Sequence, residues 1–183
     1  MLSDKELISQ CKEGNRKAQY ELYQRFSGEL YVVCLRYCKA QQEAEDVLQE
    51  SFIKIFRCIK DFRGDSALKT WMKRIVINTS LNQLRNKLYL FPMSDVEENA
   101  KVEIPFCADG HSLDDLLSMM EELPTGCRVI FNLYAVEGYK HNEIAEMLGV
   151  SEGTSKSQLS RAKSLLKNKI LEQNEPNYGK VGR

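Results

Sequence analysis

The segment from Lys140 to Arg161 constrains the fold more than any other part of the sequence. Three apolar residues fall on one stripe of a helix, namely Ile144, Ala145 and Leu148. Gly149 then supplies a residue that can adopt the left-handed conformation of a helix end. Val150 can fill a corner between two helices, and Ser151 suits the N-cap of a second helix. The segment therefore predicts two short helices joined by a tight turn.

The second of these helices has an apolar face of its own, formed by Leu159, Ala162 and Leu166. An apolar stripe, a turn glycine, an apolar plug and a cap, in this order, are typical of a helix-turn-helix. In that motif the second helix lies in the major groove of DNA. An ordinary helical hairpin is the alternative interpretation.

The charges of the chain balance, with 26 Lys and Arg against 26 Asp and Glu. A net charge of zero argues against a protein that coats nucleic acid without selectivity. The distribution is nevertheless uneven, because residues 60–87 and 156–169 are basic whereas residues 94–115 are acidic. We therefore expect two basic surfaces on either side of an acidic connector.

The composition also excludes several classes of protein. No apolar run approaches the roughly 20 residues that a membrane span needs, and the polar N-terminus lacks a signal-peptide pattern. A cytoplasmic protein without membrane insertion is therefore expected. We find no nucleophile–base cluster and no phosphate-binding loop, so we expect neither enzymatic activity nor a cofactor.

The six cysteines form no CxxC pair. They are Cys11, Cys34, Cys38, Cys58, Cys107 and Cys127. Most of them lie in apolar helical stretches, and the two histidines are far from the Cys34/Cys38 pair in sequence. Buried free thiols are therefore expected rather than a zinc site.

The patterned segments are almost all helical, which predicts an all-α fold. Ser3 and Glu6 resemble a capping box at the start of the first helix, and a longer second helix follows. Further helices are expected over about residues 42–59 and about residues 67–87. Pro124 is expected to start another helix, at its first position or nearby.

Periodicity is lost between the two patterned halves, where proline, glycine and acidic residues predict a flexible linker. Helical periodicity returns at Ser112. We therefore predict an N-terminal domain at residues 1–88, a linker at 89–111, a helix-turn-helix domain at 112–172 and a frayed tail at 173–183.

Two blocks of motifs resemble bacterial sigma factors. The sequences EDVLQESFIKIF at 45–56, FRGDS at 62–66 and TWMKRIVIN at 70–78 resemble the second region of that family. Six shorter sequences resemble the fourth region of that family, namely LP at 123–124, RVIFNL at 128–133, EG at 137–138, EIA at 143–145, GTSKS at 153–157 and RA at 161–162. Nothing resembling the third region lies between them. This arrangement of regions resembles that of the extracytoplasmic-function (ECF) group. The resemblance implies a region 2 bundle, a region 4 helix-turn-helix and a role in transcription initiation.

The resemblance implies that the polar face of the third helix docks on core RNA polymerase, at the clamp helices of the largest subunit. The residues of this face are Asp46, Gln49, Glu50 and Lys54. Region 4 would contact the polymerase flap. A merely solvated helix face is the alternative interpretation of these charges. Many members of the family also bind an anti-sigma factor, which makes such a partner a further expectation.

The basic surface formed by residues 60–87 is expected to hold the melted minus-ten element of a promoter. Single-stranded bases need a stacking platform, and their phosphates need cations. Phe62 and Asp65 are expected to line a pocket for one flipped base, and Asn78 and Asn82 to pair with base edges. The full set of expected contacts is Phe62, Arg63, Asp65, Ser66, Lys69, Lys73, Arg74, Asn78, Asn82 and Arg85. The apolar stripe of the fourth helix instead assigns Trp71 to the core.

One departure from the family lies in this region. Housekeeping sigma factors carry a tryptophan pair that wedges the duplex open, whereas here Thr70 precedes a lone Trp71. The departure implies weaker intrinsic melting and tighter promoter selectivity.

The recognition helix is expected to read the minus-thirty-five element as duplex. The residues assigned to it are Thr154, Lys156, Ser157, Ser160 and Arg161. Thr154 and the free amides of the helix start can bind a phosphate. Gln158 and Ser160 leave the base preference open. A stand-alone helix-turn-helix regulator, which binds duplex DNA without polymerase, is the alternative function.

Overall fold

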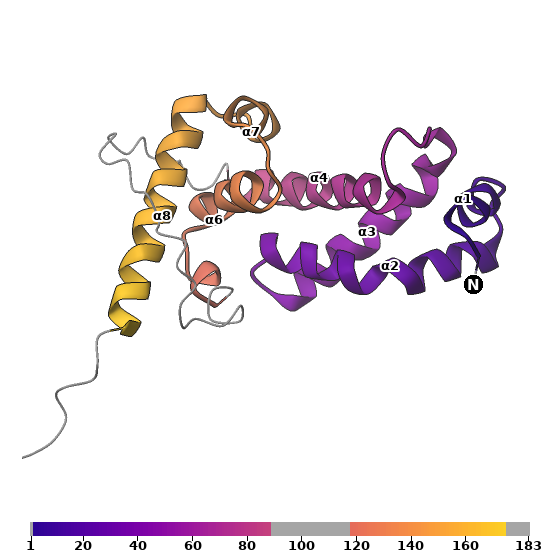
Figure 1. Cartoon of the computed structure of the whole chain (residues 1–183), viewed down its shortest axis with the longest axis horizontal. Coiled ribbons are helices and arrows are strands. Elements are labelled where there is room, and N and C mark those ends of the chain that lie inside the picture. Colours follow the sequence, from indigo (N-terminus) through magenta and orange to yellow (C-terminus); the bar gives the residue numbers. More distant parts are fainter. Residues whose placement is uncertain (1, 89–117, 175–183) are drawn as a thin grey trace, which may run out of the picture. The chain divides into compact units, whose positions relative to one another are not determined.

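The computed structural model describes residues 2–88 and 118–174, and every regular element in these ranges is a helix, as predicted (Figure 1). The chain divides into two units, residues 1–90 and 91–183. The N-terminal unit contains α1 (Asp4–Lys12), α2 (Arg16–Tyr37), α3 (Gln41–Cys58), the 3₁₀ turn η1 (Ile59–Asp61) and α4 (Leu68–Leu88). The C-terminal unit contains α6 (Thr125–Phe131), the π-helical turn η2 (Asn132–Val136), α7 (His141–Leu148) and α8 (Glu152–Asn174).

The core of the N-terminal unit lies between α2, α3 and α4, which pack against one another. Each helix contributes apolar side chains at helical spacing, for example Leu22 and Leu30 from α2, Ile55 from α3, and Met72 and Ile77 from α4. All five are at most 1 % exposed. Each such burial is worth roughly 1.5–3 kcal/mol, so this core positions the polar faces of α3 and α4 rigidly.

Helix α1 is fixed to this bundle at its start and along its length. The predicted capping box is present, because Ser3 Oγ accepts from the Glu6 amide and the Glu6 carboxylate accepts from the Ser3 amide. Leu7 and Cys11 are buried. Arg25 of α2 adds a hydrogen bond to the Leu2 carbonyl, at 2.7 Å.

The corner of the C-terminal unit has the geometry that the sequence predicts. Gly149 has φ +69°, in the left-handed region, and its amide and that of Val150 both donate to the Ala145 carbonyl, at 2.8 and 3.1 Å. Ser151 Oγ accepts from the Thr154 amide at 3.0 Å, so Ser151 is the N-cap of α8. Ile144 of α7 is fully buried, and α7 packs against α8.

Two helix boundaries in this unit differ in detail from the pattern. Pro124 lies at the N-cap of α6, one residue before the first helical position, with extended ψ of 141°. The helical pattern then widens into the η2 π-turn, which leaves Tyr134 40 % exposed although it follows the buried Leu133. The expected linker at 89–111 and the helix start at Ser112 lie outside the described residues.

The described cysteines are all free thiols. Cys11, Cys34, Cys38 and Cys127 are buried as expected, and Cys58 is exposed. Burial, with a smaller contribution from the neighbouring Cys38, raises the pKa of Cys34 to about 12. This thiol is therefore a protonated core group.

Candidate docking face and nucleic-acid interface

The polar face of α3 holds the residues that the sequence assigns to docking. Asp46 and Gln49 are exposed, whereas Glu50 and Lys54 are partly buried and form an ion pair of 2.6 Å. The hydrogen bond from Lys54 lowers the pKa of Glu50, and a hydrogen bond from Gln83 lowers it further. Asp46 and Gln49, at the outer end of this face, are thus exposed. Glu50 and Lys54, at its inner end, are tied to α4.

The tie to α4 consists of two hydrogen bonds. Gln83 Nε2 donates to Glu50 Oε2 at 3.4 Å, and Lys54 Nζ donates to Thr79 Oγ1 at 3.3 Å. Thr79 and Gln83 each lie next to one of the asparagines assigned to DNA. The inner part of the α3 face is therefore hydrogen-bonded to α4 at residues that neighbour these asparagines in sequence.

Sequence reasoning missed one residue of the α3 face. Ile53 is 51 % exposed although it is apolar. It follows Asp46, Gln49 and Glu50 by seven, four and three residues, so all four lie on one side of the helix. Single exposed apolar residues are common on protein surfaces, so Ile53 is a candidate contact because it lies beside the residues assigned to docking. Helical spacing in the sequence places Ile53 on this face, but the sequence does not report that its side chain is exposed.

The residues expected to bind the minus-ten element separate into two sets on α4. Arg74, Asn78, Asn82 and Arg85 recur at three- or four-residue spacing and form one stripe along the helix. Asn78 and Asn82 are exposed. Lys69 and Lys73 are offset from this stripe, and Lys69 forms an ion pair with Glu29 of α2. The structure therefore brings four of these six residues together and places two elsewhere.

The loop between η1 and α4 meets one end of the polar stripe. Phe62 is only 7 % exposed, and its ring packs against Trp71 with centroids 5.1 Å apart. Trp71 is half-buried rather than a full core residue, and its spacing of three residues from Arg74 places it at the end of the stripe. Arg63 and Asp65 are exposed and pair at 3.1 Å, and Ser66 is partly exposed.

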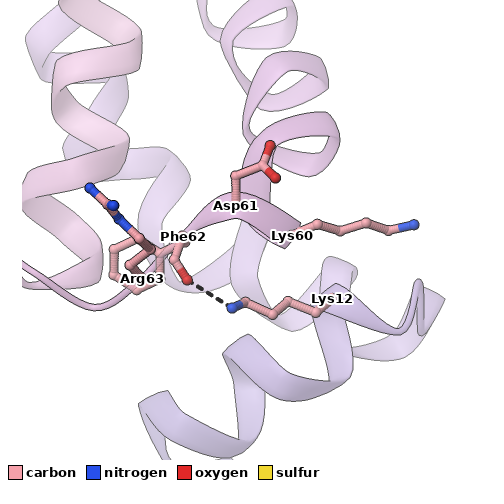
Figure 2. Close-up of a pocket in the computed structure, with 5 residues that line it drawn as sticks. All are labelled: Lys12, Lys60, Asp61, Phe62 and Arg63. Atoms are coloured by element: carbon pink, nitrogen blue, oxygen red, sulfur yellow. Dashed lines mark hydrogen bonds between the residues drawn. The ribbon is translucent and has the colours of Figure 1, made fainter.

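An open pocket lies beside the start of this loop, between α1 and η1 (Figure 2). Its lining residues are Lys12, Lys60, Asp61, Phe62 and Arg63. Phe62 is among the lining residues and Asp65 is not, and the assignment of both to a pocket for a flipped base stays a prediction. Lys12 was not anticipated, because 50 positions in the sequence separate it from the loop that it contacts.

The exposed side of α8 carries the residues assigned to the minus-thirty-five element. Lys156 and Arg161 are exposed, and Thr154, Ser157 and Ser160 are partly exposed. Lys156 lies 3.7 Å from Glu152, its partner one turn earlier. Gln158 is different, since it is only 5 % exposed and its Oε1 accepts from Cys127 Sγ at 3.0 Å. Its expected part in base readout is therefore replaced by a structural role.

A small cluster around the buried Ser155 joins three elements of the helix-turn-helix unit. His141 Nδ1 is 2.9 Å from Oγ of the fully buried Ser155, and the His141 ring stacks on Tyr134 with centroids 4.6 Å apart. Burial and the nearby Lys156 ammonium lower the pKa of His141. The neutral imidazole is therefore the form that this packing favours.

Other kinds of site are not apparent in residues 2–88 and 118–174. Within those ranges no cluster of three or more His, Cys, Asp or Glu is arranged to hold a metal ion. No helix there is long and apolar enough to cross a membrane. The described residues form an all-helical protein with a helix-turn-helix in its C-terminal unit and a polar face on α3.

Comparison with known proteins identifies the family. Residues 22–88 match the model of sigma-70 region 2, and residues 113–166 match that of sigma-70 region 4. The chain is 31 % identical to the ECF RNA polymerase sigma-E factor of Haemophilus influenzae, over 92 % of this chain and 96 % of that protein. It is 30 % identical to the RNA polymerase sigma-H factor of Pseudomonas aeruginosa, over 89 % and 91 % of the two chains.

Solved structures agree with the fold. CnrH in complex with the cytosolic domain of CnrY is 25 % identical, with a TM-score of 0.50 over 94 % of this chain and 99 % of that chain. The sigma factor RpoE of Bartonella quintana, in complex with the anti-sigma factor NepR, is 23 % identical. Its TM-score is 0.52 over 86 % of this chain and 98 % of its own. The chain belongs to the ECF sigma factors of the sigma-70 family, which are transcription initiation factors and not enzymes.

Proposed function

We propose that this sigma factor docks on core RNA polymerase through α3 and holds a melted promoter strand along α4. The observation that carries the proposal is the stripe of Arg74, Asn78, Asn82 and Arg85, which begins beside the Phe62–Ser66 loop. Amides can pair with base edges and guanidinium groups with phosphates. A stripe that carries two amides between two guanidinium groups suits one strand of nucleic acid lying along a helix.

The narrower set of contacts follows from the arrangement on α4. Lys69 is held by Glu29 on another side of the helix, so we assign it and Lys73 to the periphery. Phe62 serves mainly as the buried root of the loop, whose exposed tip at Arg63–Asp65 meets the strand. Ser66 lies where the loop enters α4.

Docking on polymerase uses Asp46, Gln49 and Glu50 with Ile53 at the centre of the face. The carboxylates select a basic or amide-rich partner surface, and the exposed isoleucine supplies apolar contact. Lys54 acts inside this face by fixing Glu50 rather than by reaching the partner. We assign this surface to the clamp helices of the largest polymerase subunit.

The C-terminal unit reads the minus-thirty-five element as duplex. Lys156 and Arg161 neutralise phosphates or contact guanine, and Ser157 and Ser160 offer short hydroxyls to base edges. Thr154, in the first turn of α8, positions a phosphate at the helix start. The side chains are small, so this contact selects a promoter without binding it tightly.

Two further partners follow from the family. The relatives CnrH and RpoE are each seen in complex, the latter with the anti-sigma factor NepR. We propose that an anti-sigma factor also binds this protein, at the exposed α3 face, and that this partner and core polymerase meet it in the cytoplasm. The polymerase flap would contact the C-terminal unit.

Run-off transcription with purified core polymerase tests the proposal. The full chain should direct initiation at a limited set of promoters in a genomic library, and mapped start sites should share two elements. Core polymerase without the chain is the control. Unchanged start sites in the two reactions would contradict the proposed function.

A further inference from the structure

The pocket beside the minus-ten loop contains one contact that the motif-based assignments do not explain. Lys12, the last residue of α1, donates a hydrogen bond of 2.7 Å from Nζ to the backbone carbonyl of Phe62 (Figure 2). The bond is partly buried and joins two segments that are 50 residues apart in sequence. It touches the loop at its first residue, where η1 ends and the exposed tip begins.

The lysine reaches the loop from a rigid support. Helix α1 buries Leu7 and Cys11, and Arg25 of α2 pairs with Asp4 at 2.9 Å. A charged donor fixed in this way forms a stronger hydrogen bond to a carbonyl than a mobile surface lysine does. Helix α1 is therefore linked to the loop by the hydrogen bond from Lys12 to the Phe62 carbonyl.

Phe62 is clamped at two points by this arrangement. Its ring is buried against Trp71, at the end of the α4 stripe, and its carbonyl is held by Lys12. The residues that follow, from Arg63 to Asp65, are exposed, and Gly64 adopts φ +83°. The exposed Arg63–Asp65 pair adds little stability of its own. The orientation of the loop tip thus depends on the clamp at its root.

We propose that Lys12 is a positioning residue for promoter reading, which makes α1 part of the minus-ten specificity apparatus. Lys12 fixes the Phe62 carbonyl, and the fixed root aims the Arg63–Ser66 tip at the captured base. A preorganised loop discriminates between bases better than a mobile loop that adapts to each of them. The inference rests on the proposed function of this loop.

The first test measures the clamp without DNA. Hydrogen exchange of the loop amides is compared in the full-length wild type, Lys12→Met, Lys12→Arg and Lys5→Met. Lys5 is a matched control because it is an exposed lysine of the same helix. Exchange at the Phe62 amide, which donates to the Ile59 carbonyl at 3.2 Å, should accelerate in Lys12→Met alone, by about tenfold, whereas Lys12→Arg keeps a cationic donor. Equal exchange at this amide in all four proteins would overturn the proposal.

The second test measures base discrimination by holoenzyme. The probe is the single non-template strand of a promoter mapped by run-off transcription, with the matched or a substituted base at each minus-ten position. Lys12→Met should lose about tenfold in discrimination between bases at one position. Its salt slope, the slope of log affinity against log salt concentration, should stay unchanged. A slope reduced by about 0.7, with discrimination intact, would mean that Lys12 contacts a phosphate directly and would refute positioning. Failure of promoter-directed transcription, by contrast, would refute the proposed function and leave the exchange result standing.

Discussion

At the scale of the residue, Asn78 and Arg74 allow the two kinds of strand contact to be separated. Both lie on the same stripe of α4, one with an amide and the other with a guanidinium group. Asn78→Ala should cost about tenfold in discrimination at one base and leave the salt dependence unchanged. Arg74→Ala should weaken binding to all sequences and reduce the salt slope by about 0.7. Holoenzyme affinity for single strands at several salt concentrations measures both.

A matched control is available in the lysine that the structure separates from the stripe. Lys69→Ala removes one positive charge from the same helix but on another side, where Glu29 pairs with it. It should change neither discrimination nor the salt slope. If Lys69→Ala matched Arg74→Ala, the stripe would not be the path of the strand.

At the scale of the element, the proposed docking face of α3 has an exposed apolar residue, Ile53, at its centre. Ile53→Ser should weaken core-polymerase binding by about tenfold, because a half-exposed isoleucine gains its burial only on docking. The double variant Asp46→Arg with Glu50→Arg should weaken it further through like-charge contact. Pull-down of core polymerase at fixed salt measures the series, and Val32→Ser on α2, where Val32 is 49 % exposed, is the control. Intact binding of the double variant would contradict the docking assignment.

The helix-turn-helix unit is expected to lose stability in acid. The pKa of His141 is lowered in the folded unit by burial and by the Lys156 and Lys163 ammonium groups, against the opposing Glu152 carboxylate. The unfolded chain therefore binds the proton more tightly. The stability that the neutral ring contributes is complete above its unfolded pKa, about 6.5, and is lost as the pH falls towards the lower folded value.

Hydrogen-exchange protection of the α7 amides measures this effect between pH 7.5 and 5.5, after correction for intrinsic exchange. His141→Gln should flatten the dependence, because glutamine keeps a polar group for Ser155 but does not titrate. His111→Gln, which removes the other histidine of the sequence, is the control. A wild-type protection that stays constant over this range would show that His141 does not couple to folding.

Much of the element scale was predictable from sequence, since caps, turn residues and periodicity act locally. The Ser3–Glu6 capping box and the Gly149 turn are examples. Contacts between distant segments left no such pattern. The Lys12–Phe62 bond and the removal of Gln158 into the core depend on how helices pack, and helical spacing in one segment cannot report that. Ile53 lies between these cases, because its spacing was visible but its exposure was not.

At the scale of the whole molecule, the two proposed DNA-reading surfaces belong to separate units of the chain. Each offers few contacts, and the small side chains of α8 are consistent with modest affinity for duplex. Core polymerase adds the remaining binding energy by linking the surfaces, which raises the effective concentration of the second contact once the first has formed. Specific recognition is then a property of the holoenzyme rather than of the free chain.

This division of labour predicts how the full chain behaves with and without polymerase. The free protein should shift a mapped promoter duplex only weakly, whereas addition of core polymerase should increase apparent affinity by roughly a hundredfold or more. Gel-shift titration at one salt concentration measures the difference, with a promoter scrambled at both elements as the control. Asp46→Arg with Glu50→Arg should abolish the gain and leave the weak binding of the free protein intact, because α8 is unchanged. A free chain that binds the duplex as tightly as the holoenzyme would instead favour a stand-alone regulator.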